Sequence, residues 1–65
     1  MYNSYPTRDQ LAPGLHVVII EKHNQQSAIE SVGIIERILS PGASHPYGIK
    51  VVLTDGRVGR VIRIG

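Results

Sequence analysis

A seven-residue pattern occurs twice in this chain and restricts its fold more than any other feature. Val32–Ile38 and Val58–Ile64 both read V-G-x-[I/V]-x-R-I, and the two copies lie 26 residues apart. β-Branched residues suit a pleated strand, and a glycine inside a strand marks a bulge, a tight bend or a close backbone approach. Two short strands that each carry such a glycine predict a small, strongly bent β-barrel.

Four strands are predicted along the chain, with polar loops between them. The first three are expected at His16–Glu21, Ile29–Leu39 and Gly48–Thr54, and the last is the second copy of the pattern. The loops are Lys22–Ser27, Ser40–Pro46 and the dipeptide Asp55-Gly56. Because side chains alternate along a strand, Ile49, Val51 and Leu53 should share one core face.

The dipeptide Asp55-Gly56 favours a two-residue type I′ hairpin turn, in which both central residues have positive φ. Such a turn would pair Val51 with Arg60 and bring an arginine to the core face. A one-residue bulge at Gly59 removes this conflict, because it places Val61 opposite Val51 and turns Arg60 outward. We therefore predict a bulge at Gly59 and a matching one at Gly33.

The chain has 65 residues, which is the size of one domain. Residues 7–65 are predicted to form it, and Met1–Pro6 to be a flexible N-terminal tail. Thr7-Arg8-Asp9-Gln10 has the form of a capping box. Since Pro13-Gly14 stops a helix soon afterwards, we expect one helical turn at most. The fold class predicted is all-β, a small SH3-like barrel of four to five bent antiparallel strands.

Composition excludes several classes of site and protein. The chain has no cysteine, which excludes disulfides and thiolate metal sites. No apolar run approaches the roughly 20 residues of a membrane-spanning helix. The first residues lack the basic and apolar regions of a signal peptide. We therefore expect a cytoplasmic protein that has no membrane partner.

Charge is unevenly distributed along the chain. Residues 1–36 contain two basic and four acidic side chains, whereas residues 37–65 contain five basic side chains and one acidic side chain. A basic C-terminal half is typical of a protein with an anionic partner, although it is also compatible with an ordinary solvated surface.

Two sets of residues resemble known families. Pro13-Gly14 with Val17 and Ile19, followed by Gly33-x-Ile35-x-x-Ile38, resembles the KOW motif of ribosomal proteins and transcription elongation factors. A longer signature is similar to the YwbE-like family of small uncharacterised proteins: P-G-x-x-V at Pro13–Val17, H-P-x-G-I-K-V at His45–Val51 and D-G-x-V-G-R-V at Asp55–Val61. These resemblances imply an SH3-like barrel and, by analogy of fold alone, contact with RNA or a ribosome.

The first functional hypothesis is binding of RNA or a ribonucleoprotein through the basic hairpin. Several cations on one surface are needed to bind a phosphate backbone. The candidate cations are Lys50, Arg57, Arg60 and Arg63. Tyr47 and His45 are added at the rim, because single-stranded recognition uses rings on which bases stack.

Two other classes of function fit the sequence less well. A protein-interaction module remains the alternative, although a chain with three Tyr and no Trp or Phe is poorly equipped for an aromatic-lined peptide groove. An enzyme is not expected, because the acidic residues form no paired arrangement. The three histidines, His16, His23 and His45, have no spacing that brings them together, so neither a metal site nor a cofactor is predicted.

Overall fold

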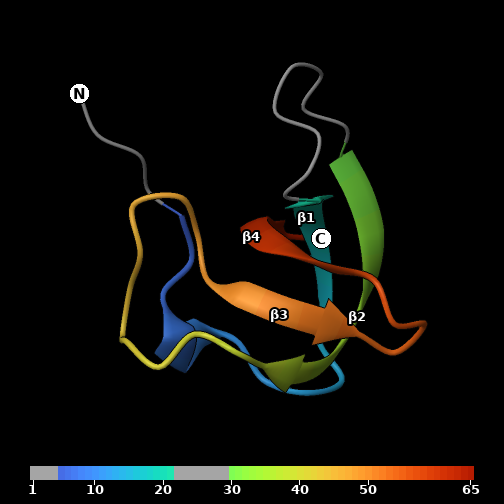
Figure 1. Cartoon of the computed structure of the whole chain (residues 1–65), viewed down its shortest axis with the longest axis horizontal. Coiled ribbons are helices and arrows are strands. Elements are labelled where there is room, and N and C mark those ends of the chain that lie inside the picture. Colours follow the sequence, from blue (N-terminus) through green and yellow to red (C-terminus); the bar gives the residue numbers. More distant parts are fainter. Residues whose placement is uncertain (1–4, 22–29) are drawn as a thin grey trace.

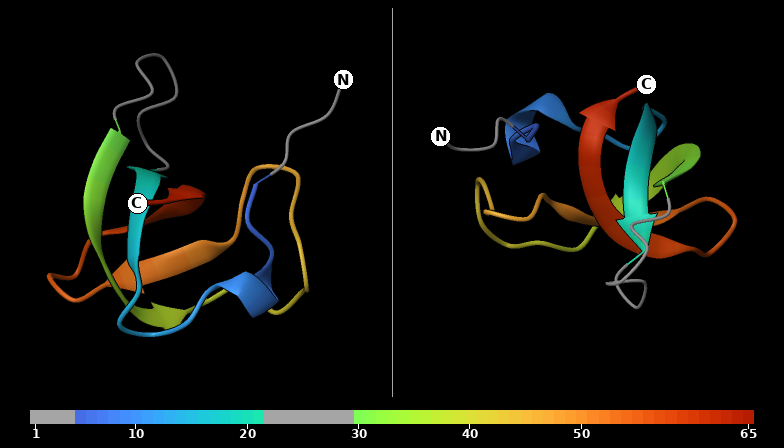
Figure 2. Two further views of the ribbon diagram at one scale, coloured as in Figure 1. Left: turned by 180° about the vertical axis from the view of Figure 1, so that it is seen from behind. Right: turned by 90° about the horizontal axis from the view of Figure 1, so that it is seen from above.

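Four antiparallel strands form a closed barrel in the computed structural model, which describes residues 5–21 and 30–65. They are β1 (His16–Glu21), β2 (Glu30–Ile38), β3 (Lys50–Leu53) and β4 (Val58–Ile64). Consecutive strands pair, and β4 pairs with β1 to complete the ring (Figures 1 and 2). The prediction of an all-β barrel of bent antiparallel strands is confirmed, with four strands.

The two copies of the repeated pattern lie in β2 and β4, on either side of β1. Gly33 of the first copy faces Val17, and Gly59 of the second faces Glu21. Neither glycine has room for a side chain. A Cβ at Gly33 would stand 2.5 Å from Leu53 Cδ1, and one at Gly59 would stand 2.6 Å from the Ile20 carbonyl oxygen. Gly59 therefore allows the close approach of the β1 backbone, whereas Gly33 leaves space for the buried Leu53 side chain.

The predicted bulges at Gly33 and Gly59 are wrong, and the observed ones lie three residues further along each copy. The β2–β3 register shifts between Ile35 and Arg37, so Glu36 is the extra residue. The β4–β1 register shifts in the same way, with Ile62 as the extra residue. Each bulge follows a buried residue, Ile35 in β2 and Val61 in β4. The extra residue turns the arginine after it, Arg37 or Arg63, to the outside of the barrel.

The hairpin between β3 and β4 also differs from the predicted type I′ turn. Gly56 has φ +94°, and no described non-glycine residue has positive φ. The Leu53 N–H donates to the Arg57 carbonyl at 2.8 Å, which leaves a three-residue loop, Thr54-Asp55-Gly56. This loop moves the register by one residue, so Val51 faces Gly59 and Lys50 faces Arg60. Arg60 thus points outward without any bulge at Gly59.

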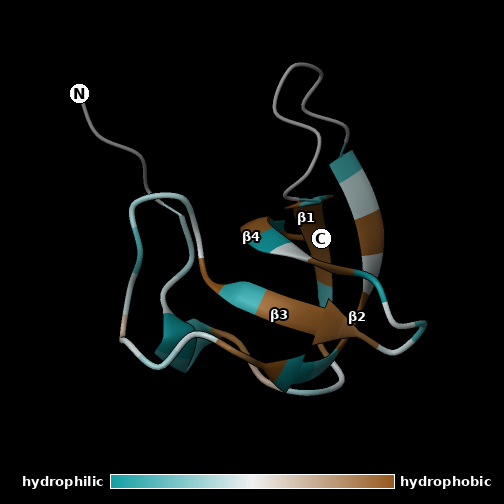
Figure 3. Ribbon diagram, viewed as in Figure 1, coloured by the Kyte–Doolittle hydropathy of each residue, from teal (hydrophilic) through white to brown (hydrophobic). Residues whose placement is uncertain are grey.

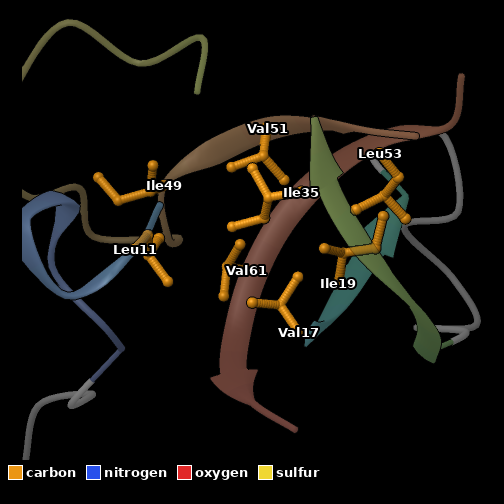
Figure 4. Close-up of a cluster of buried hydrophobic side chains, with 8 residues drawn as sticks. All are labelled: Leu11, Val17, Ile19, Ile35, Ile49, Val51, Leu53 and Val61. Atoms are coloured by element: carbon orange, nitrogen blue, oxygen red, sulfur yellow. The ribbon is translucent and has the colours of Figure 1, made fainter. Parts of the chain in front are cut away.

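The core consists of aliphatic side chains inside the barrel (Figure 4). As predicted, Ile49, Val51 and Leu53 are fully buried together. The remaining members are Leu11, Val17, Ile19, Ile35 and Val61. Leu11 follows the predicted helical turn, η1 (Arg8–Gln10), whose Thr7 N–H donates to Gln10 Oε1 at 3.0 Å. The short turn therefore brings one apolar side chain to the end of the barrel.

A long connection between β2 and β3 lies beside η1 (Figure 1). The Arg8 N–H donates to the Ala43 carbonyl at 2.8 Å and joins the two segments. No described peptide bond is cis, so the bond before Pro46 is trans. In the described part of the chain, no helix has the length and apolar character to cross a membrane. The predicted loop Lys22–Ser27 and most of the predicted tail Met1–Pro6 lie outside the described residues.

Candidate nucleic-acid interface

Lys50 and Arg60 face each other directly across β3 and β4. Val61 N–H donates to the Ile49 carbonyl at 2.9 Å in the neighbouring pair, and Leu53 N–H donates to the Arg57 carbonyl three pairs away. Hydrogen-bonded and non-hydrogen-bonded pairs alternate along an antiparallel ladder. Lys50 and Arg60 therefore occupy a non-hydrogen-bonded position, where opposed side chains are closest. Like charges at such a position destabilise a sheet. In Figure 3, β3 begins hydrophilic and continues hydrophobic, which places this charge at one end of the strand.

The Arg60 guanidinium is anchored without being neutralised. Its Nη1 donates to the Gly48 carbonyl oxygen at 2.9 Å, and the side chain is half-buried. A backbone carbonyl carries no net charge, so the full positive charge of Arg60 remains available. The same bond attaches β4 to the segment that leads into β3, beside Tyr47.

Arg37 is a third outward-facing cation, and the sequence interpretation missed it. It faces Val52 of β3 and is exposed, so it lies diagonally from Lys50 on the outside of the barrel. The repeated pattern held the signal, because Arg37 occupies the position that Arg63 occupies in the second copy. We call Arg37, Lys50 and Arg60 the basic face.

No carboxylate of the described chain forms an ion pair with the basic face. The ion pairs among the described residues are Arg57–Asp55 and Arg63–Glu30, and neither includes a residue of the basic face. The chain has five acidic side chains, all among the described residues. The charge of the basic face is therefore not neutralised from within the described protein, although Glu36 is exposed next to Arg37.

Arg8 adds a fourth cation at the margin of this surface. Its Nε donates to the Ser40 carbonyl at 3.2 Å, and Ser40 Oγ in turn accepts the Lys50 backbone N–H at 2.8 Å. Nothing in the spacing of the sequence connects Arg8 with Lys50, because the contact depends on how η1 lies against the long connection.

Arg57 and Arg63, both predicted as site residues, do not join the basic face. Arg57 Nε lies 2.7 Å from Asp55 Oδ2, and its Nη2 donates to the Val32 carbonyl at 2.9 Å. Arg63 Nη2 lies 2.7 Å from Glu30 Oε1. Each of these two cations therefore already has a carboxylate partner.

The titration of the two carboxylates reflects these contacts. The hydrogen bond from Arg63, together with its charge, lowers the pKa of Glu30 from its ordinary 4.5, and the same contact raises the pKa of Arg63. The backbone N–H of Arg57 is the main cause that lowers the pKa of Asp55 from its ordinary 3.8, and the Arg57 side chain adds to it. Both carboxylates are thus held in the charged form that pairs with arginine.

The two predicted rim residues lie together on the connection before β3. The His45 and Tyr47 ring centroids are 5.8 Å apart, and the ring planes are tilted by 47°. His45 Nδ1 accepts the Tyr47 backbone N–H at 3.1 Å. Tyr47 is 71% exposed, the largest exposure among the big apolar and aromatic side chains that the structure describes. The connection therefore presents an exposed ring on the residue before Gly48, whose carbonyl anchors Arg60.

The described residues contain no group of three His, Asp or Glu side chains close enough to hold a metal ion. His16 begins β1 and His45 lies on the long connection, whereas His23 lies outside the described residues.

Comparison with known proteins identifies relatives without assigning a function. The family of uncharacterized conserved proteins DUF2196 matches residues 4–64. The uncharacterized protein YwbE of Bacillus subtilis (strain 168) is 42% identical over 53 residues, which cover 82% of this chain and 82% of YwbE. No solved structure matches the chain.

Proposed function

We propose that this protein, which belongs to the DUF2196 family of uncharacterized conserved proteins, is a non-enzymatic module that binds RNA or a ribonucleoprotein through its basic face. One observation carries the proposal. Lys50 and Arg60 oppose each other at the closest kind of cross-strand position, and the described chain supplies no carboxylate for either. Such an arrangement costs stability in the free protein, and a bound polyanion would relieve it.

The neighbouring residues fit an extended anion. Arg37 lies diagonally from Lys50 on the same outer surface, and Arg8 approaches through Ser40. Phosphates spaced along a nucleic-acid backbone can contact such cations one after another, and each contact releases counterions. A single small anion would need far fewer cations than this surface provides.

The test compares two double variants that lower the net charge equally. Lys50→Gln/Arg60→Gln removes the opposed cations of the basic face. Arg57→Gln/Arg63→Gln, the matched control, removes the two cations that already have carboxylate partners. Fluorescence anisotropy measures the affinity of each variant for a labelled RNA of about ten nucleotides, at about 50 mM and about 200 mM KCl. Thermal melting by circular dichroism checks that each variant is folded.

We expect Lys50→Gln/Arg60→Gln to lower the affinity by about tenfold or more. The slope of log affinity against log salt should become shallower by about 1.4, since each lost contact with a single strand contributes about 0.7. The control variant should change the slope by less than half of this. Equal losses in the two variants would mean that net charge alone attracts RNA, and absence of binding at the lower salt would remove the proposal.

A further inference from the structure

We infer that the RNA is bound as a single strand. One unpaired base stacks on the Tyr47 ring, and phosphates of the RNA backbone contact Arg60 and Lys50. This inference rests on the proposed function and adds the kind of RNA that the basic face takes. Its starting point is the exposure of Tyr47, 71% of which is open to solvent in a described chain whose core contains no aromatic residue.

Tyr47 is exposed, yet the backbone on both sides of it is held in place. Its N–H donates to His45 Nδ1 at 3.1 Å, and the next N–H, that of Gly48, donates to the His45 carbonyl at 3.0 Å. Gly48 itself is buried, with φ +100°, and a Cβ there would collide with the Val61 carbonyl oxygen. A ring on such a fixed backbone loses little freedom when it binds, which favours affinity.

The ring has open surface for a ligand. His45 lies 5.8 Å from Tyr47, centroid to centroid, with a tilt of 47°, which is not the parallel arrangement that would cover a ring face. Every nucleobase has a flat face that can stack on an aromatic side chain. Tyr47 is therefore suited to a base whatever its sequence.

Tyr47 and the Arg60 contact belong to the same short backbone segment. The Arg60 guanidinium donates to the carbonyl of Gly48, the residue that follows Tyr47. Lys50, opposite Arg60, continues the positive charge along β3. A nucleotide likewise presents a flat base and a charged phosphate side by side, so one nucleotide can contact both features together.

The geometry separates single strands from duplexes. In a duplex the base faces are stacked on one another and cannot reach Tyr47, whereas the phosphates remain accessible to the basic face. Single-stranded RNA can use the ring and the cations, but duplex RNA can use the cations alone. The barrel should therefore prefer the single strand, and this preference should depend on the Tyr47 ring.

The experiment measures the affinity for a labelled single-stranded RNA of about ten nucleotides and for a duplex that contains the same sequence. The wild type is compared with Tyr47→Leu, which removes the ring, and with Tyr47→Phe, which keeps it. The Tyr47 side chain is exposed and makes no hydrogen bond to another described residue, so both variants should fold. Proton NMR follows the Tyr47 ring resonances, which a stacked base shifts upfield.

We expect Tyr47→Leu to weaken binding of the single strand by about fivefold to a hundredfold and to leave duplex binding unchanged. Tyr47→Phe should bind like the wild type, and the ring resonances should move upfield only with the single strand. Duplex binding as tight as that of the single strand, unaffected by Tyr47→Leu but lost in Lys50→Gln/Arg60→Gln, would overturn this inference and leave the proposed function in place. Failure to bind either RNA would overturn both.

Discussion

Lys50 and Arg60 can be compared with Arg57 and Arg63, because all four cations come from the same β3–β4 hairpin. Arg57 and Arg63 each end on a carboxylate at 2.7 Å, whereas Lys50 and Arg60 face each other with no acidic partner in the described chain. A count of basic residues treats the four alike. In the structure, Arg57 and Arg63 pair with the protein's own carboxylates, whereas Lys50 and Arg60 have no ion-pair partner among the described residues.

A change in the backbone that supports Arg60 should have the largest effect on the unfolding free energy. Gly48 and Gly56 have nearly the same φ, +100° and +94°, but a Cβ at Gly48 would meet the Val61 carbonyl, whereas Gly56 has no neighbour within 4 Å. Gly56→Ala should cost about 1–2 kcal/mol of unfolding free energy, from the backbone conformation alone. Gly48→Ala should cost about 3 kcal/mol or more, because overpacking is added.

Denaturant unfolding of the two alanine variants measures this difference. At a temperature where both are folded, Gly48→Ala should also weaken RNA binding, since Tyr47 and the Arg60 contact shift with the backbone. Gly56→Ala should bind like the wild type. Equal destabilisation by the two substitutions would show that the contact with Val61 does not matter.

A charge reversal at Lys50 should move stability and binding in opposite directions. Lys50→Glu turns the like-charged pair with Arg60 into an attractive one, which should raise the unfolding free energy by about 0.2–1 kcal/mol. The same change should abolish RNA binding at about 50 mM salt, because the basic face loses a cation and gains an anion. Thermal melting and anisotropy on one sample measure both effects.

Arg63→Glu is the matched control, with the same change in net charge. It places two carboxylates together at Glu30, so it should destabilise the barrel and weaken RNA binding only slightly. If Arg63→Glu reduced binding as much as Lys50→Glu, the distinction between the paired and unpaired cations would not hold.

Removing a carboxylate should convert a paired cation into an available one. Glu30→Gln frees the Arg63 guanidinium and should raise RNA affinity about twofold to threefold at low salt. Glu21→Gln changes the net charge equally, but Glu21 accepts a hydrogen bond from Ser31 and pairs with no arginine. It should therefore increase the affinity less. A parallel anisotropy measurement on the two variants decides between a local and a global charge effect.

Low pH should reduce the stability of the folded protein by a small amount. Contacts with arginine lower the pKa values of Glu30 and Asp55 in the folded protein, so the unfolded chain binds more protons at low pH. The stability that these contacts contribute is present above about pH 4.5 and is lost as the pH falls through the lowered values. Melting temperatures recorded from pH 6 to pH 2.5 should decline less in Glu30→Gln than in the wild type. An identical decline would show that the Arg63 contact contributes no stability.

The sequence interpretation succeeded where local pattern decides the structure. Alternation placed Ile49, Val51 and Leu53 on the core face, and a capping motif placed the single turn η1. The repeated pattern predicted one bulge in each copy, at Gly33 and at Gly59. The bulges are at Glu36 and Ile62 instead. A strand glycine signals either a bulge or a close approach, and only the facing atoms of Leu53 and Ile20 decide between them.

The candidate site was harder to predict because ion pairing depends on closure of the barrel. Glu30 faces Ile20 and Arg63 faces Val18, so their pair reaches across the outside of β1 between residues 33 apart in the chain. No local pattern reveals this contact. The hairpin register was missed for a different reason, since Asp-Gly suits loops of both two and three residues. That single-residue difference sets Lys50 against Arg60.

Pairing of β1 with β4, which closes the barrel, has a consequence for folding during translation. Val17 faces Ile64, so the first strand of the barrel needs the last strand of the barrel as a neighbour. At about 5–20 residues per second, the apolar run Val17–Ile20 waits several seconds before translation supplies that neighbour. The nascent barrel therefore keeps an open seam, with unpaired strand edges, until β4 has been translated.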